Sequence, residues 1–233
     1  MELADRLADI QHRIADACTR AGRSVDSVQL LAVSKTHPPA TVDAAVDLGL
    51  TLFGENRVQE ARAKIPQCSS RATWHMIGHL QSNKVRDAVE LFTMIEGVDS
   101  LRIATEINKR AEQADKTLPV LLEINVGGEA SKSGFDSATL LTELKDVSRL
   151  PALRVQGLMT IPPWKPMPEQ VRSFFVKARE LKSQCEDILG EPLPHLSMGM
   201  SGDFEVAIEE GATIVRVGTA LFGERMTIGK QAN

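Results

Sequence analysis

The chain has 233 residues, of which 42% are hydrophobic and 25% are charged. It can therefore bury a large core, and its length suits either one α/β barrel or two smaller domains. The formal net charge of −4 comes from 27 basic and 31 acidic residues that are mixed along the chain. Such a mixture provides no basic stripe for nucleic acid and no long acidic tail, so we expect a small-molecule partner and no nucleic acid.

The three cysteines and the amino terminus indicate the cellular compartment. Cys18, Cys68 and Cys185 lie far apart, form no C-x-x-C motif and are odd in number, which is not typical of a disulfide framework. The amino terminus lacks an apolar block of the signal-peptide type, and no window approaches the roughly 18 to 20 apolar residues of a membrane span. We expect a cytoplasmic protein with reduced thiols and no membrane partner.

The first predicted element is an amphipathic helix that ends near Gly22. Apolar residues recur there at three- and four-residue spacing, with charged residues between them: Leu3, Leu7, Ile10, Ile14 and Ala17.

From there on, short aliphatic runs alternate with segments of helical spacing. The runs predict strands at residues 29–34, 50–53, 74–77, 91–95, 120–126, 154–160, 195–198 and 213–217. The segments between them predict helices at residues 40–48, 56–65, 82–88, 100–114, 137–148, 168–189 and 204–210. Strict alternation indicates a parallel sheet with right-handed crossovers, and eight strands are the number that closes into a barrel.

We therefore predict an α/β fold, a single (β/α)8 TIM barrel that spans residues 1–233 as one domain, with an extra N-terminal helix. The alternative is an open doubly wound sheet, which would require a weaker run such as residues 50–53 not to be a strand. A proline-rich stretch, "IPPWKPMPE" at residues 161–169, is interpreted as a stiff loop at the barrel mouth.

In such barrels the functional groups lie at the C-terminal ends of the strands. The stretch "LLAVSKTHP" places Lys35 on the same strand face as Leu31 and Val33, so Lys35 is expected to point inward at the mouth. Partial desolvation lowers the pKa of an amine and makes it a nucleophile toward aldehydes. The alternative is a lysine that pairs with an acid such as Glu55 or extends to solvent. On the fifth strand, Glu123 and Asn125 share a face and are also expected to point into the upper barrel.

The C-terminal third has two features of an anion site. "SMGMSGDFEVAIEEGA" passes from a strand through Ser201 and Gly202 to a helix N-terminus, and "VRVGTALFG" ends the last strand with Arg216, Gly218 and Thr219. The loops after strands seven and eight are the usual phosphate site of this barrel class. The alternative is that these residues only cap helices and form tight turns. Together with an inward lysine, the two loops indicate an aldehyde-bearing phosphate ester, and pyridoxal 5′-phosphate (PLP) carries both groups.

Seven motifs carry a family resemblance, in this order: "LLAVSKTHP", "LFGENRVQEA", "WHMIGHLQSNK", "GEASKSGF", "VQGLMTIP", "LSMGMSGDFEVAIEEGAT" and "VRVGTALFGER". They closely resemble the pyridoxal phosphate homeostasis proteins, a PLP-binding family of alanine-racemase N-terminal-like barrels (PLP fold type III). The resemblance covers almost the whole chain. It implies that the protein holds PLP and takes part in intracellular PLP homeostasis.

The resemblance also implies roles for individual residues. Lys35 would form the Schiff base, Asn56 would neighbour the cofactor, and Arg216 would address the pyridine nitrogen or the phosphate. An arginine at the ring nitrogen would keep it unprotonated and weaken the electron sink. The implied phosphate cradle consists of Ser201, Gly202, Gly218 and Thr219. Two positions depart from the commoner pattern, with Arg57 where tyrosine is frequent and His79 where proline is frequent.

Two observations argue against racemase chemistry. The sequence has no tyrosine, so the tyrosine acid–base group of the alanine racemases has no counterpart, although a racemase needs proton donors on both faces of the substrate carbon. Few residues follow "GTALFGER", so we expect no second β-domain. His37, His79 and His195 stay open as candidate bases, and "HMIGH" lacks the helical arrangement of a zinc site.

Three hypotheses follow. The leading one is a non-catalytic PLP carrier, with PLP-dependent apo-enzymes as recipients. The second is a weak PLP-dependent, racemase-like amino-acid enzyme, and the third is a Schiff-base aldolase for a phosphorylated sugar, which the motif set and the position of Lys35 on strand one disfavour. We predict no metal ligand and no catalytic residue. The lack of a long exposed apolar stripe favours a monomer.

Overall fold

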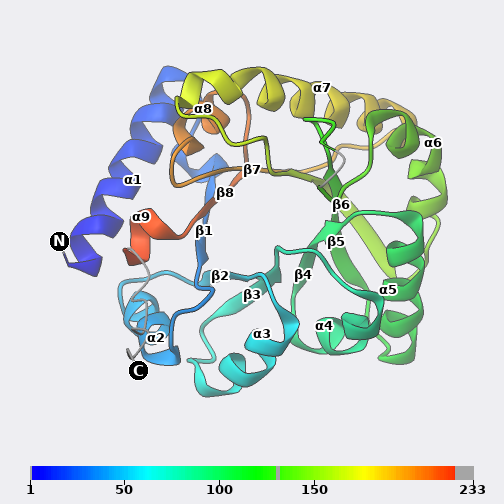
Figure 1. Cartoon of the computed structure of the whole chain (residues 1–233), viewed down its shortest axis with the longest axis horizontal. Helices are drawn as coiled ribbons and strands as arrows, with labels where there is room; N and C mark the ends of the chain where they lie inside the picture. Colours follow the sequence, from blue (N-terminus) through cyan, green and yellow to red (C-terminus); the bar gives the residue numbers. More distant parts are fainter. Residues whose placement is uncertain (1, 130–131, 224–233) are drawn as a thin grey trace, which may run out of the picture.

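The computed structural model describes residues 2–129 and 132–223, and within these ranges eight parallel strands close into a barrel in chain order (Figure 1). The first and last strands pair with each other, which closes the ring. The strands are β1 (Gln29–Val33), β2 (Leu52–Glu55), β3 (Thr73–Met76), β4 (Met94–Val98), β5 (Leu118–Ile124), β6 (Leu153–Thr160), β7 (His195–Met200) and β8 (Ile214–Val217). The predicted barrel is confirmed, and the open doubly wound sheet is excluded.

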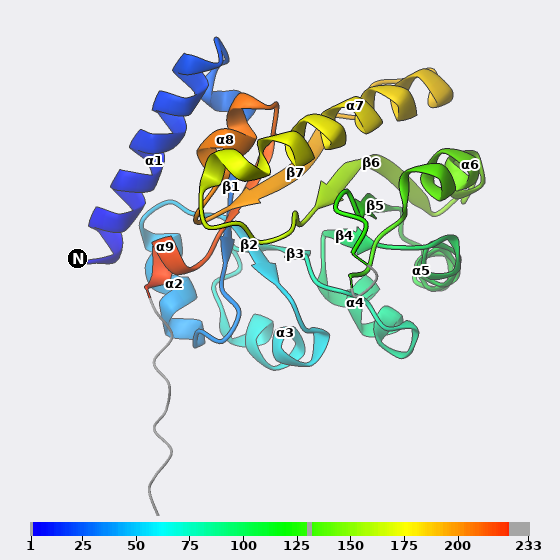
Figure 2. The ribbon, with the colours of Figure 1, turned by 45° about the horizontal axis from the view of Figure 1, so that its top comes forward.

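Helices surround the barrel, and the extra N-terminal helix lies beside the last of them (Figures 1 and 2). The helices are α1 (Leu3–Arg20), α2 (Pro39–Asp47), α3 (Val58–Lys64), α4 (Val85–Leu91), α5 (Leu101–Gln113), α6 (Ser137–Ser148), α7 (Arg172–Leu189), α8 (Phe204–Glu209) and α9 (Thr219–Phe222). The buried face of α1 contains Leu7, Ile10 and Ile14, as the spacing predicts. None of the described helices is long and apolar enough to cross a membrane.

The barrel interior is an apolar plug with polar residues above it. The plug consists of Leu31, Val33, Ile77, Met94, Leu121, Met159 and Ile214. Successive side chains of a strand point to opposite faces, so Glu123, two residues after Leu121, points inward, as does Arg216, two residues after Ile214. Both are buried. Asn125 lies beyond the end of β5, where its amide donates to the carbonyl of Glu129.

Two strands begin two or three residues later than the sequence predicts. The second was expected at residues 50–53 but covers Leu52–Glu55. Gly54 lies within this strand, where a Cβ would collide with the side chain of Leu31 in the barrel interior. The fourth was expected at residues 91–95 but covers Met94–Val98. Leu91 instead completes the last turn of α4. In both cases an aliphatic residue that belongs to the packing of a helix or loop resembles a strand start.

Candidate functional site

All seven residues predicted to bind the cofactor line one cavity at the C-terminal end of the barrel. Its volume is about 410 Å³. The predicted residues are Lys35, Asn56, Ser201, Gly202, Arg216, Gly218 and Thr219, and they come from four strand ends that are far apart in the sequence. The cavity therefore combines an amine, a guanidinium, two hydroxyl groups and glycine backbone in a single space.

Lys35 lies in a turn that is bonded on both sides. β1 ends at Val33, and the carbonyl of Ser34 accepts a 2.8 Å hydrogen bond from Lys64 Nζ. On the other side the backbone N–H of Thr36 donates to the carboxylate of Glu60. Thr36 has φ of +68°, a left-handed conformation that is uncommon for a residue other than glycine. The turn that presents Lys35 is thus held in an unusual backbone conformation by side chains of α3.

Lys64 is the centre of a buried ion-pair cluster under this turn. It is 6% exposed, and its Nζ lies 2.8 Å from both Glu55 Oε1 and Glu60 Oε1. Glu55 is fully buried and also accepts a 2.6 Å bond from Ser34 Oγ. Burial raises the pKa of Glu55 although the bonds from Lys64 and Ser34 oppose it. Glu55, the acid considered as a partner for Lys35, is therefore bonded to Lys64 and Ser34.

Ser201 links the two loops that were predicted to bind phosphate. Its Oγ accepts hydrogen bonds of 3.3 Å from the backbone N–H groups of Gly218 and Ala220. Because the oxygen accepts both bonds, its hydroxyl proton can be donated to an acceptor in the cavity. Asp203, the residue before α8, accepts a 2.6 Å bond from the N–H of Met200, and burial raises its pKa. Asp203 thus occupies the N-cap position of α8, but its side chain bonds the end of β7 and makes no capping bond to the helix, and Ser201 faces the cavity.

Arg216 enters the cavity from a buried polar network. Its guanidinium donates to Ser197 Oγ at 2.7 Å and to the carbonyl of Thr160 at 2.8 Å. Ser197 Oγ in turn donates to Glu96 Oε2 at 2.6 Å, and the other oxygen of Glu96 lies 2.7 Å from His75 Nδ1.

Burial affects the pKa values of both charged groups in this network. It lowers the pKa of Arg216, whereas Glu96, Glu123 and Asp203 oppose that change. Burial would raise the pKa of Glu96, but the bond and charge of His75 and the charge of Arg216 bring it below its usual value. An ionised Glu96 accepts the proton of Ser197 Oγ, and the same Oγ accepts from Arg216, so Glu96 orients the guanidinium through Ser197.

The two positions that depart from the family pattern lie beside the cavity. Arg57 and His79 line a second hollow of about 540 Å³, which shares Asn56 with the first. His79 Nδ1 lies 2.9 Å from Asp99 Oδ2 and 3.1 Å from Ser133 Oγ. His79 is thus part of a hydrogen-bonded rim, and Arg57 is exposed at the start of α3.

The sequence did not reveal every residue of the site. Trp164, in the proline-rich loop that was expected at the mouth, lines the cavity although it is 84% exposed. His37, which the sequence left open as a candidate base, also lines it, with its ring 4.9 Å from that of Phe222. The Glu60–Lys64 pair could have been suspected from its i, i+4 spacing, but no local signal connects it with Lys35.

Comparisons with known proteins agree with this architecture. The family model described as "Alanine racemase, N-terminal domain" matches residues 6–226. The pyridoxal phosphate homeostasis protein of Aquifex aeolicus is 46% identical over 226 residues, which are 97% of this chain and 99% of that protein. The pyridoxal phosphate homeostasis protein of Escherichia coli K12 is 44% identical over 231 residues, 96% of this chain and 97% of that protein.

A solved structure shows the same relationship in three dimensions. PipY of Synechococcus elongatus PCC7942, solved with PLP bound, is 38% identical and superposes with a TM-score of 0.84, covering 95% of this chain and 100% of PipY. The seven sequence motifs, the closed barrel and these full-length matches lead to one assignment. The chain belongs to the alanine racemase N-terminal domain family and, within it, to the pyridoxal phosphate homeostasis proteins.

Proposed function

We propose that this protein binds PLP at Lys35 and takes part in intracellular PLP homeostasis as a carrier that does not turn over a substrate. The single observation that supports this most is the cavity itself, in which Lys35, Arg216 and the loops after β7 and β8 face one space. The homeostasis function of the relatives from Aquifex aeolicus and Escherichia coli, and the PLP bound to PipY, agree with it.

Each part of PLP has a chemically suitable partner in the cavity. PLP supplies an aldehyde, which condenses with an amine with loss of water, and the amine would be that of Lys35. The hydroxyls of Ser201 and Thr219 and the backbone of Gly202 and Gly218 would hold the phosphate. A Cβ built on Gly202 meets no described atom within 4 Å, so the lack of a side chain there leaves room for a ligand.

Arg216 would face the pyridine nitrogen. Its guanidinium is oriented by Ser197 and Thr160 and can donate a hydrogen bond but not accept one. A donor of this kind leaves the ring nitrogen without a proton of its own, and this weakens the ring as an electron sink. The same residue that would bind the ring would therefore weaken its stabilisation of a substrate carbanion.

The groups that a racemase needs are only partly furnished. The sequence has no tyrosine. Of the three candidate histidines, His37 lines the cavity and His79 lines the neighbouring hollow, while His195 is half-buried with its pKa lowered by burial. A two-base mechanism requires a proton donor on each face of the substrate carbon. We therefore favour a carrier that passes PLP to apo-enzymes in the cytoplasm, where Cys18, Cys68 and Cys185 stay free thiols.

The proposal is tested by loading the purified protein with PLP and removing unbound cofactor by gel filtration. We expect PLP to remain with the folded protein in about equal molar amount and to give the visible absorbance of an imine. Incubation of the loaded protein with a panel of L-amino acids, followed by chiral chromatography, should show imine exchange without racemisation. Failure of the folded protein to retain PLP would remove the proposal, and multiple turnovers would establish an enzyme instead.

A further inference from the structure

The N-terminal helix α1 contacts the two helices that follow the proposed phosphate loops. α8 follows the loop after β7 and α9 follows the loop after β8, and α1 lies along both (Figure 2). Four arginines on or just after α1 make contacts with α8 and α9: Arg6, Arg13, Arg20 and Arg23. The barrel itself closes through the pairing of β1 with β8, and these contacts add a second connection between α1 and the helices after β7 and β8.

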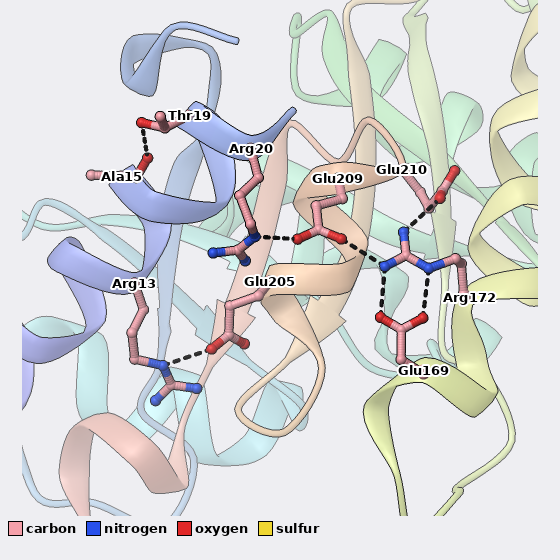
Figure 3. Close-up of polar contacts among 9 residues, drawn as sticks. All are labelled: Arg13, Ala15, Thr19, Arg20, Glu169, Arg172, Glu205, Glu209 and Glu210. Atoms are coloured by element: carbon pink, nitrogen blue, oxygen red, sulfur yellow. Dashed lines mark hydrogen bonds and ion pairs between the residues drawn. The ribbon is translucent and has the colours of Figure 1, made fainter. Parts of the chain in front are cut away.

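Arg13 holds the first turn of α8. Its Nε lies 2.7 Å from Glu205 Oε1 (Figure 3), and its guanidinium lies 4.6 Å above the ring of Phe204. Phe204 is fully buried, and a Cβ on Gly199 would lie only 3.0 Å from its Cα. The first turn of α8, which Arg13 contacts, therefore packs closely against the end of β7, directly before the loop that contains Ser201.

The other end of α8 is held from two sides. Arg20 Nε lies 2.7 Å from one carboxylate oxygen of Glu209, and Arg172 Nη2 lies 2.6 Å from the other (Figure 3). Arg172 also bonds Glu169 and Glu210, which joins α8 to α7. α8 is thus linked to α1 and α7 by ion pairs in which the side chains of Glu205 and Glu209 are only 26% and 21% exposed.

Two arginines contact backbone carbonyls near the C-terminal ends of both helices. Arg23 Nη1 donates to the carbonyl of Ile208 in α8 at 2.7 Å, and Arg6 Nε donates to the carbonyl of Leu221 in α9 at 2.6 Å. A cation at the C-terminal end of a helix is favourable. The opposite end of each helix begins at the loop that lines the cavity, so α1 holds both loops from behind.

We propose that the docking of α1 on α8 and α9 is energetically coupled to occupancy of the phosphate cradle. Ser201 Oγ bonds the N–H groups of Gly218 and Ala220 at 3.3 Å, so a displacement of either helix changes the spacing of the cradle. Coupling between two sites is reciprocal: phosphate in the cradle tightens the docking of α1, and loosening of α1 releases phosphate. The inference rests on the proposed function, and it identifies α1 as the element that tunes cofactor retention.

The first experiment compares PLP with pyridoxal, which lacks the phosphate. In the Arg13→Gln/Arg20→Gln variant we expect PLP to dissociate about fivefold faster or more, as for a typical coupling between sites, and pyridoxal to dissociate at the wild-type rate. The control is Arg62→Gln, which breaks a 3.2 Å pair with Asp87 between α3 and α4. Thermal unfolding establishes that each variant is folded, and Arg20→Gln alone replaces the double variant if that one unfolds. Equal acceleration for both ligands would overturn the proposal, because it would mean general loosening.

The second experiment uses the unloaded protein and inorganic phosphate alone. Hydrogen exchange should slow in residues 3–20 when phosphate is added to the wild type, and this protection should be smaller in the double variant and unchanged in Arg62→Gln. Protection of α8 without any protection of α1 would contradict the coupling. If the wild type retains no PLP but phosphate still protects α1, the proposed function fails and the coupling stands. If PLP is retained and α1 is not protected, the coupling fails and the proposed function stands.

Discussion

Lys64 Nζ donates a 2.8 Å hydrogen bond to the backbone carbonyl of Ser34, the residue that precedes Lys35. The same ammonium bonds Glu55 and Glu60, and Glu60 accepts from the N–H of Thr36 on the far side of Lys35. One buried ion-pair cluster therefore fixes both ends of the turn that carries the proposed cofactor-binding amine. Its integrity should matter for both folding and cofactor binding.

We predict that Lys64→Met lowers the free energy of unfolding by about 3–5 kcal/mol, because it leaves the carboxylate of Glu55 buried without a counter-charge. The double variant Lys64→Met/Glu55→Gln should recover much of this loss, since it also removes the unpaired charge. Denaturant unfolding of the two variants measures the difference. Arg62→Gln serves as the exposed-pair control and should cost at most about 1 kcal/mol. If the free energy of unfolding fell no further in Lys64→Met than in the control, the cluster would not hold the turn.

Gly202 offers a test of the phosphate cradle that does not disturb the fold. A Cβ at Gly202 meets no described atom within 4 Å, so Gly202→Val should unfold at nearly the wild-type denaturant concentration. The new side chain should occupy space where we place the phosphate. We therefore expect the affinity for PLP, measured by absorbance titration, to fall much more than that for pyridoxal. A parallel loss of both affinities would mean that the phosphate lies elsewhere.

Glu123 should make stability depend on pH. Its side chain is buried in the barrel, Oε2 lacks a hydrogen-bond partner among the described residues, and burial raises its pKa. A raised folded-state pKa means that stability falls as pH rises from the unfolded-state value to the folded-state value. We predict that Glu123→Gln is more stable than the wild type at neutral pH, by about 1.4 kcal/mol per unit of pKa change. The gain should vanish below about pH 4. Denaturant unfolding across this range measures both, and a gain that is independent of pH would contradict the charge argument.

The arginine contacts of α8 should have the opposite pH dependence. The bonds from Arg172 and Arg20 lower the pKa of Glu209 although its burial opposes them. A lowered folded-state pKa gives stability that is present above the unfolded-state value of about 4.3 and lost as pH falls through the folded-state pKa. Arg172→Gln should therefore be less stable than the wild type at neutral pH, and the difference should shrink in acid. A difference that stays constant down to the lowest pH would assign the effect of Arg172 to packing.

Most of the fold follows from the sequence because each strand and helix carries its own periodic pattern. The predicted starts of β2 and β4 were too early, because the aliphatic residues before Leu52 and Met94 pack in other elements. A local pattern does not reveal this. α9 was not predicted. It has four residues, too few for any helical period to appear.

The candidate site could be predicted where it depends on strand direction and loop type. Lys35 and Arg216 follow inward-facing apolar residues, and glycines mark the loops after β7 and β8. The remainder depends on contacts between distant segments. Lys64 reaches the turn of Lys35 only after α3 has packed on the barrel. Trp164 meets the cavity through a proline-rich loop that is bonded to the segment after β5, where Lys132 Nζ donates to the carbonyl of Pro162.

The central claim is that Lys35 is the amine that binds PLP, and borohydride reduction tests it most directly. Reduction of the PLP-loaded wild-type protein converts an imine into a stable secondary amine, which peptide mass spectrometry locates by residue. We predict the phosphopyridoxyl mass on the peptide that contains Lys35, and a large decrease of that adduct when excess phosphate competes for the cradle. An adduct found mainly on another lysine, or none on protein that has retained PLP, would contradict the account.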